Sequence, residues 1–246
     1  MTMRHTRSMT VNHSLRQAAV LVFCCVLSLL LMAGCETNLR LRQKGYDALY
    51  QRDYATARSM YQKAIRRNPT DAEAQYYLGV VELKLDQPLR AQLALEKALE
   101  LKSEDPELTP RILDKLAESL FQQGRMESLY AFLADTASNY GHTRDYLRQA
   151  QFMLMAGDLD GAKLAFNKAA YFADEDDITP YLAIADFYDS INDVPNAIVA
   201  LQYAYWVNPN YPGLDNRFRK YGVVPGPTVA AKPPKPDLLR KTYTDD

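Results

Sequence analysis

Few residues of this 246-residue chain carry the thiol or imidazole groups that most often serve as catalytic nucleophiles, bases or zinc ligands. Five of its six cysteines and histidines lie within the first 35 residues, and only His142 comes later. A nucleophile–base triad or a zinc site needs several such side chains brought together. His142 stands alone in the loop-like segment 139–143, so the sequence predicts neither an enzyme nor a cofactor site.

The acidic run Asp174-Glu175-Asp176-Asp177 is the other group of candidate ligands. A calcium loop alternates its acidic ligands, turns at a glycine and ends on a bidentate glutamate. This run has none of that spacing, and it falls where two helical units are expected to join. We therefore expect a solvated turn and no metal site.

A basic leader and an apolar segment open the chain. Arg4, Arg7 and Arg16 precede the apolar run 18–31, which only Ser28 interrupts. This order is typical of a secretory signal peptide. The run is shorter than the about 20 apolar residues that a membrane-spanning helix needs. An uncleaved signal anchor is the alternative interpretation.

The following run, Met32-Ala33-Gly34-Cys35, resembles the lipobox of bacterial lipoprotein precursors, with methionine where that family prefers leucine. The resemblance implies that residues 1–34 are removed and that Cys35 is acylated, with palmitate, ahead of a linker over 35–37. Glu36 in place of aspartate implies the outer membrane rather than the inner membrane. We therefore expect a lipid-anchored protein of the bacterial cell envelope that faces the periplasm.

The net charge of the chain indicates whether nucleic acid is a possible partner. The leader holds three basic and no acidic residues, so the remaining chain has 26 basic and 30 acidic residues and a formal charge of −4. A weakly acidic protein has no general attraction to the phosphates of nucleic acid. The sequence therefore predicts no nucleic-acid binding.

Small and large apolar residues recur at a nearly constant period. The first set of positions is spaced by 34, 38, 33 and 35 residues: Ala57, Ala91, Leu129, Ala162 and Ala197. Large residues follow four positions later: Tyr61, Leu95, Leu133, Phe166 and Leu201. Small residues precede the first set by twelve positions: Gly45, Gly79, Ala117, Ala150 and Ala185. Because residues four apart share one face of a helix, the pattern predicts repeated, closely packed helices.

This register resembles the tetratricopeptide repeat, in which each unit is a pair of antiparallel helices. The resemblance implies an all-α, right-handed solenoid over residues 38–211. Its five units are about 38–71, 72–105, 110–142, 143–177 and 178–211. In the third unit Leu129 and Thr136 replace alanines, so we expect its helices to lie farther apart.

Two further segments follow the repeats. Residues 212–221 contain a short polar sequence that we expect to form a capping helix over the last apolar face. Residues 222–246 are rich in proline and small or charged residues, and we expect them to form a disordered tail.

Repeat proteins of this family line a concave groove with the first helix of each pair. The family geometry implies a groove that binds a partner protein or peptide through Tyr46, Tyr50, Tyr76, Tyr77, Arg111, Lys115, Arg144 and Arg148. Tyrosine suits such contacts because it combines apolar area with a hydroxyl group. Arg42, Tyr46 and Tyr77 occupy the places of the family's Lys and Asn carboxylate clamp, so that clamp is absent.

The sequence favours a lipid-anchored scaffold or adaptor of the envelope that binds an envelope protein or peptide. Similar lipoproteins act in pilus assembly, outer-membrane assembly and peptidoglycan machinery, and nothing in the sequence chooses among these pathways. A passive structural spacer is the alternative. An envelope enzyme that uses the repeats to position a substrate is a weaker one.

Overall fold

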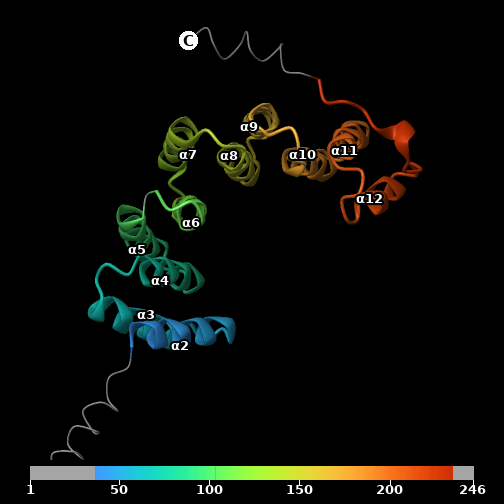
Figure 1. The fold of residues 1–246 in the computed structure, drawn as a ribbon. Coiled ribbons are helices and arrows are strands. Elements are labelled where there is room, and N and C mark those ends of the chain that lie inside the picture. Colours follow the sequence, from blue (N-terminus) through green and yellow to red (C-terminus); the bar gives the residue numbers. More distant parts are fainter. Residues whose placement is uncertain (1–36, 103, 235–246) are drawn as a thin grey trace, which may run out of the picture. The chain divides into compact units, whose positions relative to one another are not determined.

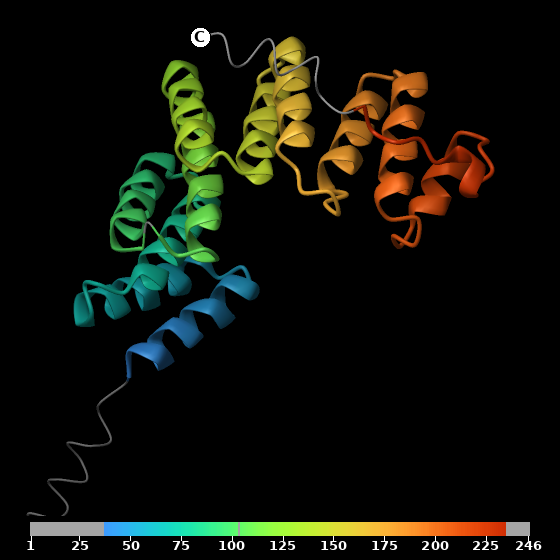
Figure 2. The same ribbon diagram turned by 45° about the horizontal axis from the view of Figure 1, so that its top comes forward.

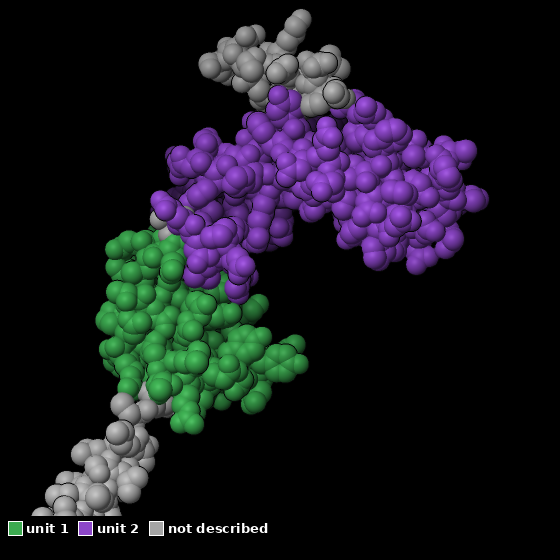
Figure 3. Space-filling model, in the orientation of Figure 1, with its two compact units in different colours: residues 1–103 green, residues 104–246 purple. Residues whose placement is uncertain are grey.

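The computed structural model describes residues 37–102 and 104–234, and these residues form helices without any strand. The predicted all-α fold is confirmed. The chain divides into two compact units, unit 1 up to residue 103 and unit 2 from residue 104 (Figure 3). The predicted signal peptide, Cys35 and residues 235–246 lie outside the described residues.

Unit 1 contains two helix pairs, in which each helix packs against the next along the chain (Figure 1). Its helices are α2 (Asn38–Tyr50), α3 (Tyr54–Arg67), α4 (Ala72–Lys84) and α5 (Pro88–Leu101). The first helices of the two pairs, α2 and α4, also contact each other. This second contact creates the surface on which the candidate site lies.

Unit 2 continues the arrangement with three pairs and a terminal helix (Figure 2). Its elements are α6 (Leu108–Gln122), α7 (Met126–Tyr140), α8 (Thr143–Met155), α9 (Leu159–Tyr171), α10 (Thr179–Ser190), α11 (Val194–Val207), α12 (Leu214–Lys220) and the short 3₁₀ helix η1 (Pro227–Val229). As in unit 1, alternate helices also touch, α6 with α8 and α8 with α10.

Aspartate is the N-cap residue of four of these helices. Asp53, Asp71, Asp158 and Asp193 each accept a hydrogen bond from the backbone N–H three residues later, at the start of α3, α4, α9 and α11. Such caps satisfy N–H groups that have no partner inside the helix. The caps therefore define where these helices begin.

The turn inside each pair uses a left-handed residue at the same place. The φ angles are positive at Arg52, Asp86, Gly124, Gly157 and Asn192. These residues are separated by the same 34, 38, 33 and 35 positions as the packing residues. The left-handed residue ends the first helix and redirects the chain into the second.

Small residues on the first helix of each pair face large ones on the second. In unit 1, a Cβ atom on Gly45 would lie 2.8 Å from Cζ of Tyr61, and one on Gly79 would lie 2.5 Å from Cγ of Leu95. Tyr61 and Leu95 are fully buried. The predicted close packing of the helices is therefore present at the small residues in both pairs of unit 1.

The α6–α7 pair packs less extensively than the other pairs. Its contact surface carries the bulkier Leu129 and Thr136, which are buried where the other units have alanine. The expectation that these residues separate the two helices agrees with this looser packing.

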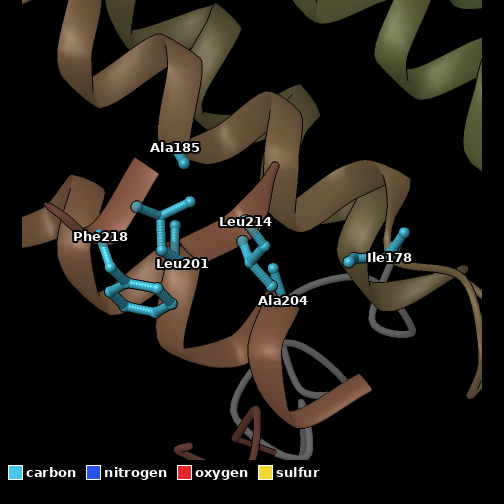
Figure 4. Packing of buried hydrophobic residues seen from close by; sticks show 7 residues of the cluster. Ile178, Ala185, Leu201, Ala204, Leu214 and Phe218 are labelled. Atoms are coloured by element: carbon cyan, nitrogen blue, oxygen red, sulfur yellow. The ribbon is translucent and has the colours of Figure 1, made fainter. Parts of the chain in front are cut away.

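The helix α12 covers the end of unit 2. Its Leu214 and Phe218 are buried against Leu201 and Ala204 of α11 (Figure 4). Burial of two large apolar side chains on one helix face stabilises the last pair by several kcal/mol, at about 1.5–3 kcal/mol for each side chain.

The chain after α12 corrects one prediction. Val223 and Val229 pack against the same cluster as α12, and the N–H of Ala231 donates to the carbonyl of Gln202 in α11. The predicted disordered tail is therefore wrong over residues 222–234. Composition alone suggested disorder, but the two valines supply apolar contacts that hold the segment on α11.

None of the helices over the described residues is long and apolar enough to cross a membrane.

Candidate functional site

An exposed apolar stripe runs along α2. Leu39, Tyr46 and Tyr50 are 66%, 48% and 82% exposed. Their spacing of seven and four residues places them on one face of the helix. Exposed large apolar side chains that gather on one face are a feature of interaction surfaces.

Tyr77 of α4 packs against Tyr46 of this stripe. Its ring stacks on that of Tyr61, with centroids 5.6 Å apart and planes 11° apart. The edge contacts with Tyr46 and Tyr76 have centroid distances of 6.1 and 5.0 Å. These four residues, Tyr46, Tyr61, Tyr76 and Tyr77, form the tyrosine cluster of unit 1. Ring contacts of this kind hold the half-exposed Tyr46 in a defined orientation.

A small pocket of about 160 Å³ opens beside the cluster, between α2 and α4. It is lined by Leu39, Arg42, Gln43, Tyr46, Glu73 and Tyr77. Apolar walls with a few polar groups at the rim are typical of binding pockets. The volume fits one side chain of a partner rather than a whole small molecule, because such molecules occupy sites of about 300–1,000 Å³.

Charged groups at the rim tie the two helices together. Arg42 of α2 forms ion pairs with Glu73 and with Asp71, the latter at 3.3 Å. Asp71 also accepts from the side chain of Asn38 and from the N–H of Ala74. The carboxylate of Asp71 is 8% exposed, so it serves the α2–α4 contact and is not offered to a ligand.

One polar atom of the cluster has no partner. The hydroxyl group of Tyr61 is buried and makes no hydrogen bond within the described residues. Burial raises the pKa of this phenol well above its ordinary value, and the neighbouring Tyr77 and Tyr46 raise it further. A buried hydroxyl without a partner has lost its hydrogen bonds to water.

The structure separates the residues predicted to line a groove. Tyr46, Tyr50 and Tyr77 are accessible at or beside the α2–α4 pocket. Tyr76 is only 5% exposed, so its predicted role as an exposed groove residue is wrong. Its neighbour Tyr77 presents a ring at the surface instead.

Arg148 requires a second correction. It is 3% exposed and pairs with Asp145 at 2.8 Å and with Asp114 of α6 at 2.7 Å. A third contact goes to the carbonyl of Pro110 at 3.4 Å. Arg148 therefore joins α8 to α6 and is not available to a partner. The sequence shows Asp145 three residues before Arg148, but it could not reveal Asp114, which comes from another helix.

The remaining predicted residues lie on the surface of unit 2. Arg111 is exposed on α6. Lys115 is half-buried and pairs with Glu118 at 2.6 Å. Arg144 is exposed and pairs with Asp114 at 2.6 Å. These cations belong to the other unit, so the site of unit 1 does not include them.

Sequence reasoning missed four of the residues that line the pocket: Leu39, Arg42, Gln43 and Glu73. Leu39 precedes Tyr46 by seven positions, and this spacing on one helix face was the available signal. Glu73 could not be recognised, because its role comes from the approach of α4 to Arg42 of α2.

Among the described residues, no group of three or more His, Cys, Asp and Glu side chains is placed to hold a metal ion.

Residues 42–107 match the family model of the tetratricopeptide repeat. Three solved structures of similar fold illustrate the likeness. The first is TTC0263, a tetratricopeptide repeat protein of Thermus thermophilus, with 20% identity and a TM-score of 0.50, covering 75% of this chain and 98% of that one. A tetratricopeptide repeat protein of Parabacteroides merdae has 15% identity and a TM-score of 0.54, covering 83% and 78%.

The third is PilW, a type IV pilus biogenesis factor, with 15% identity and a TM-score of 0.51, covering 85% of this chain and 95% of PilW. At these identities the likeness concerns the fold. No curated protein matches the chain in sequence.

Proposed function

We propose that this chain, a tetratricopeptide repeat protein in residues 42–107, is a protein–protein interaction scaffold that binds a partner segment at the α2–α4 pocket. The observation that carries the proposal is the exposed stripe of Leu39, Tyr46 and Tyr50 beside that pocket. An aromatic anchor held in place by neighbouring rings binds with little loss of conformational entropy.

The partner supplies an apolar side chain to the pocket. The walls of Leu39, Tyr46 and Tyr77 offer apolar contact, while Arg42 is already paired with Asp71 and Glu73. A charged side chain of the partner would find little net attraction there, because Arg42 and the two carboxylates already form ion pairs with each other. An aliphatic or aromatic residue of an extended segment fits this chemistry best, with the exposed Tyr50 extending the contact.

Photo-crosslinking in the native cells tests this site. A photoreactive phenylalanine replaces Tyr46 or Tyr50, and the control position is Gln62, which is exposed on α3. We expect Tyr46 and Tyr50 to capture the same protein, and Tyr46→Ala to remove the capture from position 50. Equal capture from Gln62, or none from either tyrosine, would exclude the pocket as the docking site and favour a passive spacer.

The proposal includes a lipid anchor at Cys35, in the outer membrane and facing the periplasm. It rests on the lipobox-like run 32–35, which lies outside the described residues. Cys35→Ala is expected to abolish labelling by a palmitate analogue and to move the protein to the soluble periplasmic fraction. Retention of the variant in membranes would instead support an uncleaved signal anchor.

The pathway that the scaffold serves stays open. Pilus biogenesis is the process named for PilW, but the likeness to PilW concerns the fold. Outer-membrane assembly and the peptidoglycan machinery are equally compatible with an envelope scaffold. The protein captured from Tyr46 and Tyr50 would identify the pathway directly.

A further inference from the structure

A second, larger cavity lies within unit 2. Its volume is about 520 Å³, within the range of ligand sites. One side is lined by residues 141–144 and Leu147, from the turn between α7 and α8 and the start of α8. The other side is lined by Phe172, Asp174, Asp177 and Thr179, from the turn between α9 and α10 and the start of α10. The cavity therefore lies between two successive connections of helix pairs, α7 to α8 and α9 to α10.

The aromatic ring in this cavity is exposed and held in place. Phe172 is 46% exposed. Its ring stacks on Tyr146 of α8, with centroids 4.9 Å apart and planes 8° apart, and Tyr171 meets it edge-on at 4.8 Å. Tyr146 covers one face of the Phe172 ring, and the exposed fraction of Phe172 leaves part of the ring accessible. The accessible face of an aromatic ring carries negative potential and attracts cations.

The charge in the lining is negative. Asp174 and Asp177 belong to the run 174–177, and no ion pair involves any of its four carboxylates in the part of the chain that the structure describes. The lining also contains one cation, Arg144, which pairs with Asp114 at 2.6 Å, so the two carboxylates outnumber it. Asp177 accepts from the N–H of Thr179 at 2.9 Å through one oxygen, and its second oxygen is not used in that contact.

We propose that this cavity binds an arginine side chain from an extended segment of a partner protein. The guanidinium stacks on the accessible face of Phe172 and donates to the carboxylates of Asp174 and Asp177, while Leu147 contacts its aliphatic stem. Arginine fits better than lysine because its planar group stacks and donates at the same time. The site differs from the α2–α4 pocket in unit, charge and ligand.

Fluorescence anisotropy on the full-length chain in detergent tests the assignment. The probe is a fluorescein-labelled peptide of three Arg-Gly-Ser repeats at low salt, and citrulline replaces arginine in the reference peptide. We expect the arginine peptide to bind at least tenfold more tightly than the citrulline peptide. Asp174→Asn with Asp177→Asn is expected to weaken its binding roughly tenfold, and Phe172→Leu about threefold.

Matched variants separate this cavity from general charge attraction. Glu175→Gln with Asp176→Asn removes the same charge from the same run outside the lining, and is expected to leave binding within twofold. Tyr46→Ala, in unit 1, is expected to have no effect. Equal losses from the two double variants would overturn the proposal, since binding would then follow net charge alone.

Two other results would also overturn it. Equal binding of the arginine and citrulline peptides would remove the cation requirement. A tenfold gain in affinity for a chain ending at residue 234 would show that residues 235–246, which include Arg240 and Lys241, occupy the cavity instead of a partner. Asparagine keeps the hydrogen-bond acceptor at the start of α10, and unchanged helical circular dichroism would establish that the variants fold.

Discussion

Gly45 of α2 lies directly against the phenol ring of Tyr61 in α3, so closely that a Cβ atom at position 45 would approach Cζ of Tyr61 to 2.8 Å. Tyr61 is fully buried and stacked on Tyr77, so its ring has no free space to move into. The tyrosine cluster that supports the candidate site therefore depends on the absence of a side chain at residue 45.

The variant Gly45→Ala is expected to destabilise unit 1 by about 1–3 kcal/mol, because overpacking outweighs the gain of about 1 kcal/mol in helix propensity. Urea unfolding measures the change. Ala117 and Leu133 form the corresponding pair in the third unit, so Gly45→Ala combined with Tyr61→Leu should cost less than the sum of the two single variants. If the loss of stability in the double variant equalled the sum of the two single losses, the contact between residues 45 and 61 would not be the cause of the destabilisation.

Removing the buried hydroxyl of Tyr61 should not harm the fold. The oxygen makes no hydrogen bond within the described residues, so Tyr61→Phe is expected to leave the free energy of unfolding unchanged or to raise it by up to about 1 kcal/mol. Tyr61→Leu is the contrasting variant and should destabilise, because it removes the stack on Tyr77. A clear loss of stability in Tyr61→Phe would reveal a partner for the hydroxyl, such as a buried water molecule.

Arg148 and Arg144 both pair with Asp114, but only Arg148 is buried. Arg148→Ala leaves the buried carboxylate of Asp145 without its cation, and should destabilise unit 2 by about 3–5 kcal/mol. Arg144→Ala removes an exposed pair and should cost less than about 1 kcal/mol. Chemical denaturation of the two variants provides the comparison, and similar losses would contradict the structural role assigned to Arg148.

The turn residue Gly157 has a φ of 82°, and a Cβ atom there would meet nothing within 4 Å. Gly157→Ala therefore tests backbone conformation without a steric clash, and should destabilise by about 1 kcal/mol. Arg52 occupies the equivalent turn of the first pair at a φ of 62°, so Arg52→Gly should shift the unfolding midpoint in the opposite direction. If both variants shifted the unfolding midpoint in the same direction, backbone conformation at these turns would not explain the changes.

Low pH should loosen the capping helix α12. Hydrogen bonds from Lys220, at 2.5 Å, and from Tyr221, at 2.7 Å, hold the pKa of Asp189 below its ordinary value. Because the folded pKa is lower than the unfolded one, the contribution of Asp189 is complete above its unfolded pKa of about 3.9 and is lost as the pH falls through the folded value.

The denaturation midpoint of the native chain should therefore fall more steeply between about pH 4 and pH 2 than that of Asp189→Asn. At the alkaline end, the same hydrogen bond raises the pKa of Lys220, so its contribution is complete below the unfolded pKa of lysine and is lost as the pH rises through the higher folded value. Parallel acid profiles for the native chain and the variant would exclude Asp189 as a source of the pH dependence.

The sequence by itself determined the helix pairs. Spacing alone located Gly45 and Gly79 on the contact between paired helices, because their positions recur with the repeat and small residues permit close approach. The turns also depend on local chemistry, since a cap or a left-handed residue involves neighbours within a few positions.

Only the tertiary structure decided which polar and aromatic side chains remain accessible. Tyr76 and Arg148 satisfy the same helical pattern as Tyr46 and Arg144, yet they are buried, because exposure depends on residues that other helices bring near. For the same reason the cavity between residues 141–147 and 172–179 was invisible in the sequence. Its ring and carboxylates become one site only when α8 and α10 pack together.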